Sequence, residues 1–280
     1  MPPFAIFLLI LACVFAVLFV LYVLSVKPNV RREEAKKFMK GCYAHRGLHD
    51  DRLPENSLAA FAAACEAGYD IELDVQLSRD GIPMVFHDAS LARVCGIDAR
   101  LSEYTAEELS AMPLLGKAAH TIPTLAEVLS LVNGRVKLMV EIKGETDVIQ
   151  VCEKTAALLD TYDGPYCVES FSPYVVRWFR DNRPGVVRGQ LSSHFWCDPR
   201  HRNKNGFIMQ SLFTNFLTKP DFISFEHQYS RYFPFWLATK FYRSYSSAWT
   251  VKSRAQEIAC QRHFNCIIFE GYRPEKRNGQ

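Results

Sequence analysis

Residues 70–88 read DIELDVQLSRDGIPMVFHD, and this stretch decides the fold. Its first part, Asp70–Leu77, alternates apolar and polar side chains strictly, which is the period of a β-strand with one face against a core. Residues 83–87 form a second β-rich run, and only the five residues 78–82 separate the two runs. Because a parallel crossover needs about a dozen residues or more, the second run is predicted to be the returning arm of a hairpin.

Seven further β-rich runs alternate with helical patterns, as expected for repeated βα units around a parallel sheet. They are predicted at residues 42–45, 136–143, 167–170, 186–191, 222–225, 247–251 and 266–269. Setting the hairpin arm aside leaves eight parallel strands. The predicted fold class is therefore α/β: a (β/α)8 TIM barrel with an insertion after the second strand, where residues 88–123 would cap one edge of the barrel mouth.

The N-terminal segment has the composition of a membrane span. Residues 4–26 carry no charge and are apolar apart from Tyr22 and Ser25. At ~1.5 Å per residue such a helix can cross a hydrocarbon core of about 30 Å. A signal peptide would begin with basic residues and end in a small-x-small cleavage site, so a retained transmembrane helix is expected. Residues 27–40 would then be a basic juxtamembrane linker and residues 41–280 the barrel domain.

Charge and cysteine content indicate the side of the membrane. No Lys or Arg precedes the span, whereas six follow it closely: Lys27, Arg31, Arg32, Lys36, Lys37 and Lys40. Positive flanking residues tend to stay in the cytosol, so a single-pass protein with a cytosolic barrel is predicted, with an outward-facing barrel as the alternative. Nine cysteines without a Cys-x-x-Cys pair suit a reducing compartment. The net charge of +3 is spread along the chain and gives no case for nucleic-acid binding.

Three carboxylates are predicted to point into the barrel. Strand alternation turns Glu72 and Asp74 inward, and the run 138–143 places Glu141 and Lys143 on one face near its carboxyl end. Ionised carboxylates gathered in one interior would repel one another unless a cation holds them or some are protonated. Oxygen ligands favour Mg²⁺ or Ca²⁺ as that cation. The alternative is a salt-bridge network with Arg46 and Lys143.

Two histidines are expected at the barrel mouth, because His45 ends the first strand and His87 ends the hairpin arm. A pair of imidazoles can share proton removal and proton donation near neutral pH. Arg46 offers a planar donor fork for phosphate oxygens, and Lys143 a point charge. The role of His49 is left open, and the other histidines are expected to be structural.

Several motifs carry a family resemblance. The strings AHRG (44–47), PENSLAAF (54–61), ELDV (72–75), VFHD (85–88) and EIK (141–143), in this order, closely resemble the glycerophosphodiester phosphodiesterase family. Shorter matches follow at residues 170–171, 189–191, 220–223 and 249–251. The resemblance covers most of residues 40–270.

This resemblance implies a reaction and a role for each matching residue. It implies metal-dependent hydrolysis of glycerophosphodiesters to glycerol 3-phosphate and an alcohol, on a (β/α)8 barrel and with Mg²⁺ or Ca²⁺. The implied roles are acid/base catalysis for His45 and His87, metal binding for Glu72, Asp74 and Glu141, and phosphate binding for Arg46 and Lys143. Phe171 and Trp249 are candidates to line the substrate site.

Two positions depart from the family pattern. Glu270-Gly271 stands where a Thr-Asp pair is usual, and Lys252 where Asn is common. Both are expected to lie outside the metal and histidine set, and to affect only how the alcohol or glycerol end is held.

Two other functions are alternatives to glycerophosphodiester hydrolysis. The first is a lysophospholipase D that acts on lysolipids of the bilayer. The second is a catalytically silent membrane scaffold, which is disfavoured because the metal and histidine residues are all retained. Residues 206–219 add a further hypothesis, an amphipathic helix resting on the membrane, against the alternative of an ordinary barrel helix. The expected partners are the substrate and the lipid bilayer, and the sequence leaves the oligomeric state open.

Overall fold

Eight parallel strands close into a barrel in the computed structural model, which describes residues 2–30, 32–144, 147–197, 199 and 202–275. β1 pairs with both β2 and β11, so Ala44 lies between Ile71 and Phe269 and the sheet has no open end. The predicted TIM barrel is therefore confirmed. In barrel order the strands are β1 (Cys42–Ala44), β2 (Asp70–Leu77), β6 (Leu138–Ile142), β7 (Tyr166–Ser170), β8 (Arg188–Ser192), β9 (Phe222–Glu226), β10 (Tyr245–Val251) and β11 (Cys266–Phe269).

The ninth predicted strand is the expected hairpin arm. β3 (Pro83–Val85) pairs antiparallel with β2, and Val75 lies opposite Val85. Met84 also bridges to Thr124, which precedes the next helix. The arm thus lies beside the barrel and runs from the carboxyl end of β2 back toward its middle, where the Phe86 amide donates to the Asp74 carbonyl at 3.0 Å.

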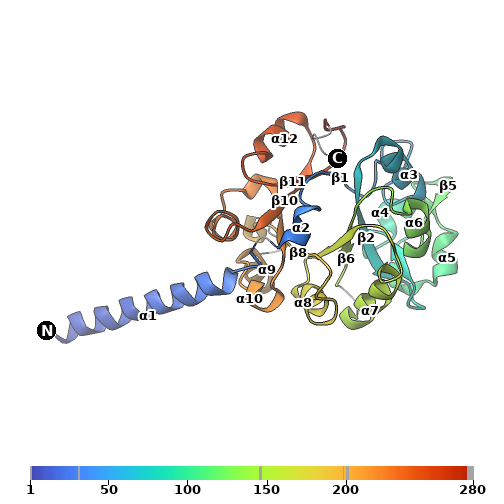
Figure 1. The fold of residues 1–280 in the computed structure, drawn as a ribbon. Helices are drawn as coiled ribbons and strands as arrows, with labels where there is room; N and C mark the ends of the chain where they lie inside the picture. The colour runs from blue at the N-terminus through green and yellow to red at the C-terminus, as the bar shows by residue number, and fades with distance from the viewer. Residues whose placement is uncertain (1, 31, 145–146, 198, 200–201, 276–280) are drawn as a thin grey trace.

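The helices lie around the barrel (Figure 1), and several of them begin or end at residues whose chemistry favours caps. The Ser57 side chain accepts the Ala60 amide at the start of α3 (Leu58–Ala67), and Gly68 ends this helix in the left-handed region at φ 67°. Thr124 and Glu127 form a capping box on α6 (Leu125–Val132). The ring is continued by α7 (Val148–Leu159), α8 (Pro173–Asn182) and α12 (Arg254–Cys260).

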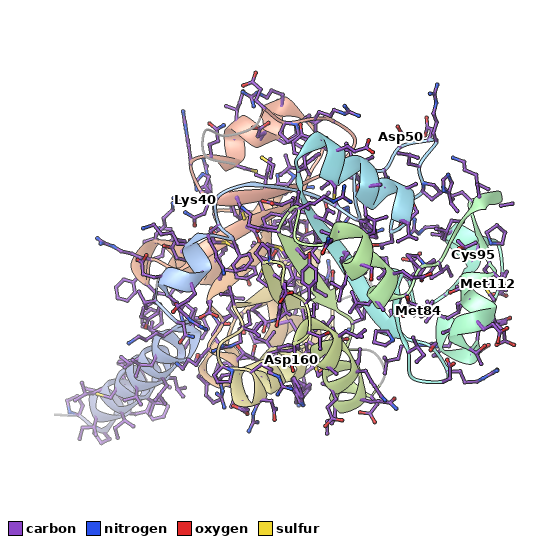
Figure 2. The ribbon with its side chains drawn as sticks, turned by 45° about the vertical axis from the view of Figure 1, so that its right-hand side comes forward. Lys40, Asp50, Met84, Cys95, Met112 and Asp160 are labelled. Atoms are coloured by element: carbon purple, nitrogen blue, oxygen red, sulfur yellow. The ribbon has the colours of Figure 1, made fainter. Side chains whose placement is uncertain are left out.

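The insertion after β2 has a small core of its own. It contains α4 (Ala92–Cys95), η1 (Leu101–Glu103), α5 (Ala106–Ser110) and the hairpin of β4 (Pro113–Leu114) and β5 (Lys117–Thr121). Its buried apolar side chains pack on Met84 and Phe86 of the hairpin arm. Figure 2 shows Met84, Cys95 and Met112 close together at the end of the molecule away from α1.

The connections between β8 and β10 are broken into short helices. After β8 come η2 (Phe195–Cys197), α9 (Lys204–Gln210) and α10 (Asn215–Thr218), and after β9 come η4 (His227–Tyr229), α11 (Phe233–Trp236) and η5 (Leu237–Phe241). One helix over residues 206–219 is therefore wrong, because Leu212 has φ 54° and separates α9 from α10. The basic patch expected before this helix consists of Arg200, Arg202 and Lys204, and Arg200 lies outside the described residues.

The apolar N-terminal segment forms one long helix, α1 (Pro3–Val26), with a mean hydropathy of 3.3 over its most apolar window. It projects away from the barrel beside α9 and α10 (Figure 1). Its last turns are built into the fold: Asn215 Nδ2 donates to the Val26 carbonyl at 2.8 Å, and Tyr242 Oη donates to the Val23 carbonyl at 2.8 Å. Val26 itself is fully buried in the main core.

Residues after α1 close the amino-terminal end of the barrel. α2 (Glu33–Lys36) and the turn that follows bury Ala35, Phe38 and Met39 against side chains of the strand starts, such as Tyr43 and Phe222. This segment was expected to be a basic linker, yet it also packs as part of the core. Arg31 lies outside the described residues.

Candidate active site at the carboxyl ends of the strands

The three predicted metal ligands meet inside the barrel. The alternation of β2 turns Glu72 and Asp74 inward, and the register places Asp74 opposite Glu141 of β6. All three side chains are buried, and one carboxylate oxygen from each lies within 4.8 Å of the other two. Oxygens from two adjacent strands therefore form one compact ligand set.

A strained turn supplies part of the support for these carboxylates. Arg46 adopts φ 55° and Gly47 φ 83°, and in this turn the Arg46 amide donates to Glu72 Oε2 at 3.0 Å. A Cβ atom at Gly47 would lie 2.9 Å from Ala60, so only glycine fits this approach to α3. The turn depends on residues 46–47 of the AHRG motif.

Positive groups contact the cluster from two sides. Lys143 Nζ lies 2.7 Å from Asp74 Oδ1 and 2.5 Å from Glu141 Oε1. Arg46 Nε lies 3.4 Å from Asp74 Oδ2, which also accepts a hydrogen bond from Asn56 at 2.9 Å. The salt-bridge network predicted as the alternative to a metal is thus present.

That network leaves charge uncompensated at Glu72. Burial, together with the nearby Asp74 and Glu141 carboxylates, raises the pKa of Glu72 well above its usual value. Burial also raises the pKa of Glu141. For Asp74 burial acts in the same direction and is the largest single effect, but Lys143, Arg46 and the other positive groups nearby together outweigh it and hold the pKa of this carboxyl below its usual value. A hard divalent cation fits this donor set, because three carboxylate oxygens suit it and its charge would keep Glu72 ionised.

A fourth carboxyl group lies beside the cluster and was missed. Glu169 of β7 stands opposite Glu141 in the register and is 2% exposed. Burial, reinforced by the Glu141 carboxylate, raises the pKa of Glu169 well above its usual value. The alternation of side chains in residues 167–170 predicts that Glu169 points inward, so this residue could have been identified from the sequence.

His45 is held by a residue far away in the sequence. Its Nδ1 lies 2.7 Å from Glu270 Oε2 and its Nε2 4.0 Å from Glu72 Oε2. Burial lowers the pKa of His45 to about 4, so the ring is neutral at pH 7. The hydrogen bond from His45 in turn lowers the pKa of Glu270 to about 2. A neutral ring that donates through Nδ1 keeps an unprotonated Nε2.

The two departures from the family pattern belong to this arrangement. Lys252 Nζ lies 3.3 Å from Glu270 Oε1, and Glu270 in turn contacts His45. The expectation that both lie outside the metal and histidine set is therefore wrong for Glu270. Barrel closure brings the end of β11 beside β1. The contact between Glu270 and His45 could not be predicted because the two residues are far apart in the sequence.

His87 has a carboxylate partner of its own. Its Nδ1 lies 2.6 Å from Asp88 Oδ1, while Asp88 Oδ2 accepts from Arg93 Nε at 2.6 Å. Arg93 also donates twice to Glu55, at 2.7 and 2.8 Å. Glu55 accepts from Arg46 at 2.7 Å, so a continuous chain of charged groups links the insertion to the AHRG turn. Sequence reasoning missed Glu55, Asp88 and Arg93 as members of the site.

A cavity of 1460 Å³ opens over the strand ends. Its lining includes His87, Glu141 and Lys143, and also Phe171 and Trp249, whose rings meet edge to face at 5.6 Å. Both predicted aromatic residues therefore line the cavity. A second cavity of 710 Å³ lies beside Glu270 and is lined in part by His49, one of whose ring nitrogens lies within 4.8 Å of His45 and Glu270 atoms.

Comparison with known proteins identifies the family. Residues 45–222 match the model of the glycerophosphoryl diester phosphodiesterase family, which is more than half of the chain. The chain belongs to this family. A glycerophosphodiester phosphodiesterase of Caldanaerobacter subterraneus is 32% identical over 169 residues, covering 56% of this chain and 69% of that protein. The family and the class of enzyme expected from the motifs are thereby confirmed.

Other relatives share less of their length or sequence. A glycerophosphodiester phosphodiesterase of Bacillus altitudinis is 41% identical, but the match spans 38% of this chain and 45% of that protein. Among solved structures, an Oleispira antarctica phosphodiesterase in complex with the product sn-glycerol-3-phosphate superposes with a TM-score of 0.68 at 21% identity. That match covers 84% of this chain and 94% of the other, and it supports the barrel fold.

Proposed function

We propose that the protein hydrolyses glycerophosphodiesters to glycerol 3-phosphate and an alcohol, with a divalent metal and with His45 and His87 as the acid/base pair. One observation carries the proposal. Two histidines, each with a carboxylate oxygen at Nδ1, flank a buried cluster of three carboxylates at the barrel mouth. Family membership supports the same reaction.

Phosphate binding is assigned to Arg46 and Lys143, because both cations already contact the carboxylate cluster. A bound phosphodiester would lie next to them, with its negative oxygens facing the ammonium and guanidinium groups. When bound, a Mg²⁺ or Ca²⁺ ion held by Glu72, Asp74 and Glu141 would neutralise charge that develops on the phosphoryl oxygens.

Proton transfer is assigned to the Nε2 atoms of the two histidines. Glu270 holds Nδ1 of His45, so its Nε2 is free to remove a proton from the attacking oxygen, whether that is water or a substrate hydroxyl. Asp88 holds Nδ1 of His87, which leaves Nε2 of that ring to exchange a proton with the departing alkoxide. Each carboxylate fixes a ring so that one nitrogen serves the substrate.

The metal assignment is tested by chelation and by substitution. The parent is expected to lose activity in EDTA and to recover it with Mg²⁺ or Ca²⁺ in a panel of glycerophosphodiesters. Glu72→Gln, Asp74→Asn and Glu141→Gln should each weaken divalent-ion binding in calorimetry, because each keeps the shape and removes charge. Glu153→Gln on the exposed side of α7 is the matched control. Full activity of protein that elemental analysis shows to be metal-free would refute the assignment.

We propose further that α1 is a retained single-pass anchor with the barrel in the cytosol. The burial of Val26 and the hydrogen bonds from Asn215 and Tyr242 support retention, because cleavage after α1 would remove part of the core. The basic residues that follow the helix support the orientation.

A lysophospholipid is the second candidate substrate. The 1460 Å³ cavity extends from Lys143 to apolar side chains of α9, among them Ile208 and Met209, and α9 lies beside the anchor (Figure 1). Release of choline from glycerophosphocholine is to be compared with its release from lysophosphatidylcholine micelles. A higher kcat/KM for the micellar substrate would favour the lysophospholipase D reaction.

A further inference from the structure

Exposed aromatic side chains are concentrated in one part of this protein. Outside α1, eight large aromatic side chains are exposed in the described part of the chain, and seven of them lie between residues 196 and 241. The other exposed aliphatic side chains of the barrel, such as Ile82, Leu115, Ile149 and Ile258, are scattered over separate elements. Scattered apolar residues are ordinary on a protein surface, but a concentration of aromatic rings indicates a contact face.

These rings surround the point where α1 leaves the barrel. α1 packs against α10 and η5, and Phe233 at the start of α11 lies 6.4 Å from the ring of Phe19 and 6.5 Å from that of Tyr22. Tyr22 also donates to the Ser211 carbonyl between α9 and α10. We call this surface the aromatic face; it consists of Phe207, Phe213, Phe216, Phe233, Trp236 and Phe241, which are 42–60% exposed.

The length of α1 sets the level of the bilayer boundary. About 20 residues cross a hydrocarbon core of ~30 Å. Counted from Pro3, they end near Tyr22, and of the residues that remain in the helix Val23, Ser25 and Val26 pack on the barrel. Phe233, which contacts Phe19 and Tyr22, therefore lies at the height where the hydrocarbon core ends. Aromatic side chains are favoured at that height.

The charges of this region fit the same surroundings. Between residues 202 and 243 the acidic side chains are Asp221, which is fully buried, and Glu226, which lines the substrate cavity. The same stretch carries six basic residues: Arg202, Lys204, Lys219, Arg231, Lys240 and Arg243. Basic groups next to aromatic rings match the headgroup region of a phospholipid bilayer.

We propose that the aromatic face rests in the interfacial layer of the bilayer that α1 crosses. This contact adds a second membrane-binding surface, separate in sequence from the anchor. It keeps the α9–η5 side of the barrel against the bilayer. Because α9 contributes Phe207 to the face and Ile208 and Met209 to the cavity wall, a single helix separates the substrate cavity from the lipid. The proposal rests on α1 being an anchor. The experiment therefore tests separately whether α1 inserts into the bilayer and whether the aromatic face contacts lipid.

The test uses the full chain in vesicles of phosphatidylcholine and phosphatidylglycerol. Insertion of α1 is shown first by protein that stays with the vesicles after alkaline carbonate extraction. Tryptophan emission is then compared between ordinary lipids and lipids brominated near the headgroup end of the acyl chains. The difference between the parent and Trp236→Phe isolates Trp236, and roughly half or more of its emission is expected to be quenched at this depth.

A matched control carries its tryptophan on the opposite side of the barrel. Ile149 on α7 is 60% exposed, and α7 lies on the side of the barrel away from α1 (Figure 1). Trp236→Phe combined with Ile149→Trp should show no added quenching. Inserted protein whose Trp236 emission is equal in both lipids overturns the proposal. A blue-shifted but unquenched Trp236 does so as well, because a second copy of the chain would then cover the face.

Discussion

Among the histidines that the structure describes, His45 and His87 are the two with a carboxylate oxygen within 2.7 Å of Nδ1, and both lie beside the carboxylate cluster. We expect His45→Ala and His87→Ala each to reduce turnover by about 100 to 10,000-fold, which is the usual effect of losing one proton-transfer group. Divalent-ion binding should persist in both variants, as measured by calorimetry. His263→Ala, outside the site, is the control. A variant within a factor of about three of the parent would show that its histidine is not one of the pair.

Glu270 is predicted to act on catalysis through His45. Its carboxylate raises the pKa of His45 against the stronger, lowering effect of burial. In Glu270→Gln the imidazole therefore stays neutral to lower pH, so the acid limb of kcat/KM should move to lower pH. Turnover should fall by about 10 to 100-fold, as for other groups that orient a functional histidine.

The control for this experiment is Lys252→Gln, because Lys252 contacts Glu270 but not the ring and its side chain is 61% exposed. It should change turnover by less than about threefold, as expected for an exposed ion pair. An unchanged pH profile in Glu270→Gln would show that the 2.7 Å contact only stabilises the fold.

At the scale of elements, the segment between α1 and β1 is predicted to matter for stability. Phe38 is 1% exposed, and Tyr43 donates to its carbonyl at 2.8 Å at the amino-terminal end of the barrel. Phe38→Ala should destabilise the protein by about 3 to 5 kcal/mol, because it removes a buried ring and leaves a cavity. In detergent micelles this corresponds to a Tm lower by roughly 10 °C.

Val30→Ala provides the comparison within the same segment, since Val30 is 49% exposed. Val30→Ala should change the free energy of unfolding by no more than about 0.5 kcal/mol. Equal stability of the two variants would mean that residues 27–40 are a linker, as their basic composition first indicated.

At the scale of the whole molecule, the proposed orientation in the membrane would decide which substrates the enzyme meets. The basic residues after α1 predict a cytosolic barrel, which would act on cytosolic diesters or on lipids of the inner leaflet. An epitope tag added after Gln280 should be protected from protease in intact cells and cleaved after lysis. Cleavage before lysis would place the barrel outside, where it would act on external diesters.

Local sequence was sufficient for the elements and for most of the side chains that meet at the barrel mouth. Alternation in β2 and β6 located Glu72, Asp74 and Glu141, because a strand's period is set by its own backbone. The hairpin loop between β2 and β3 was too short for any other connection. The strand ends that carry His45 and His87 followed from the same reasoning.

Contacts between distant segments were decided by the tertiary structure alone. Glu270 reaches His45 across 225 residues because β11 closes the barrel beside β1. Arg93 joins Asp88 to Glu55 because α4 of the insertion lies next to the loop that precedes α3. The aromatic face likewise forms because α10, α11 and η5 meet at the end of α1. A periodic pattern shows which way a side chain points from its own element, whereas barrel closure determines which side chains it meets.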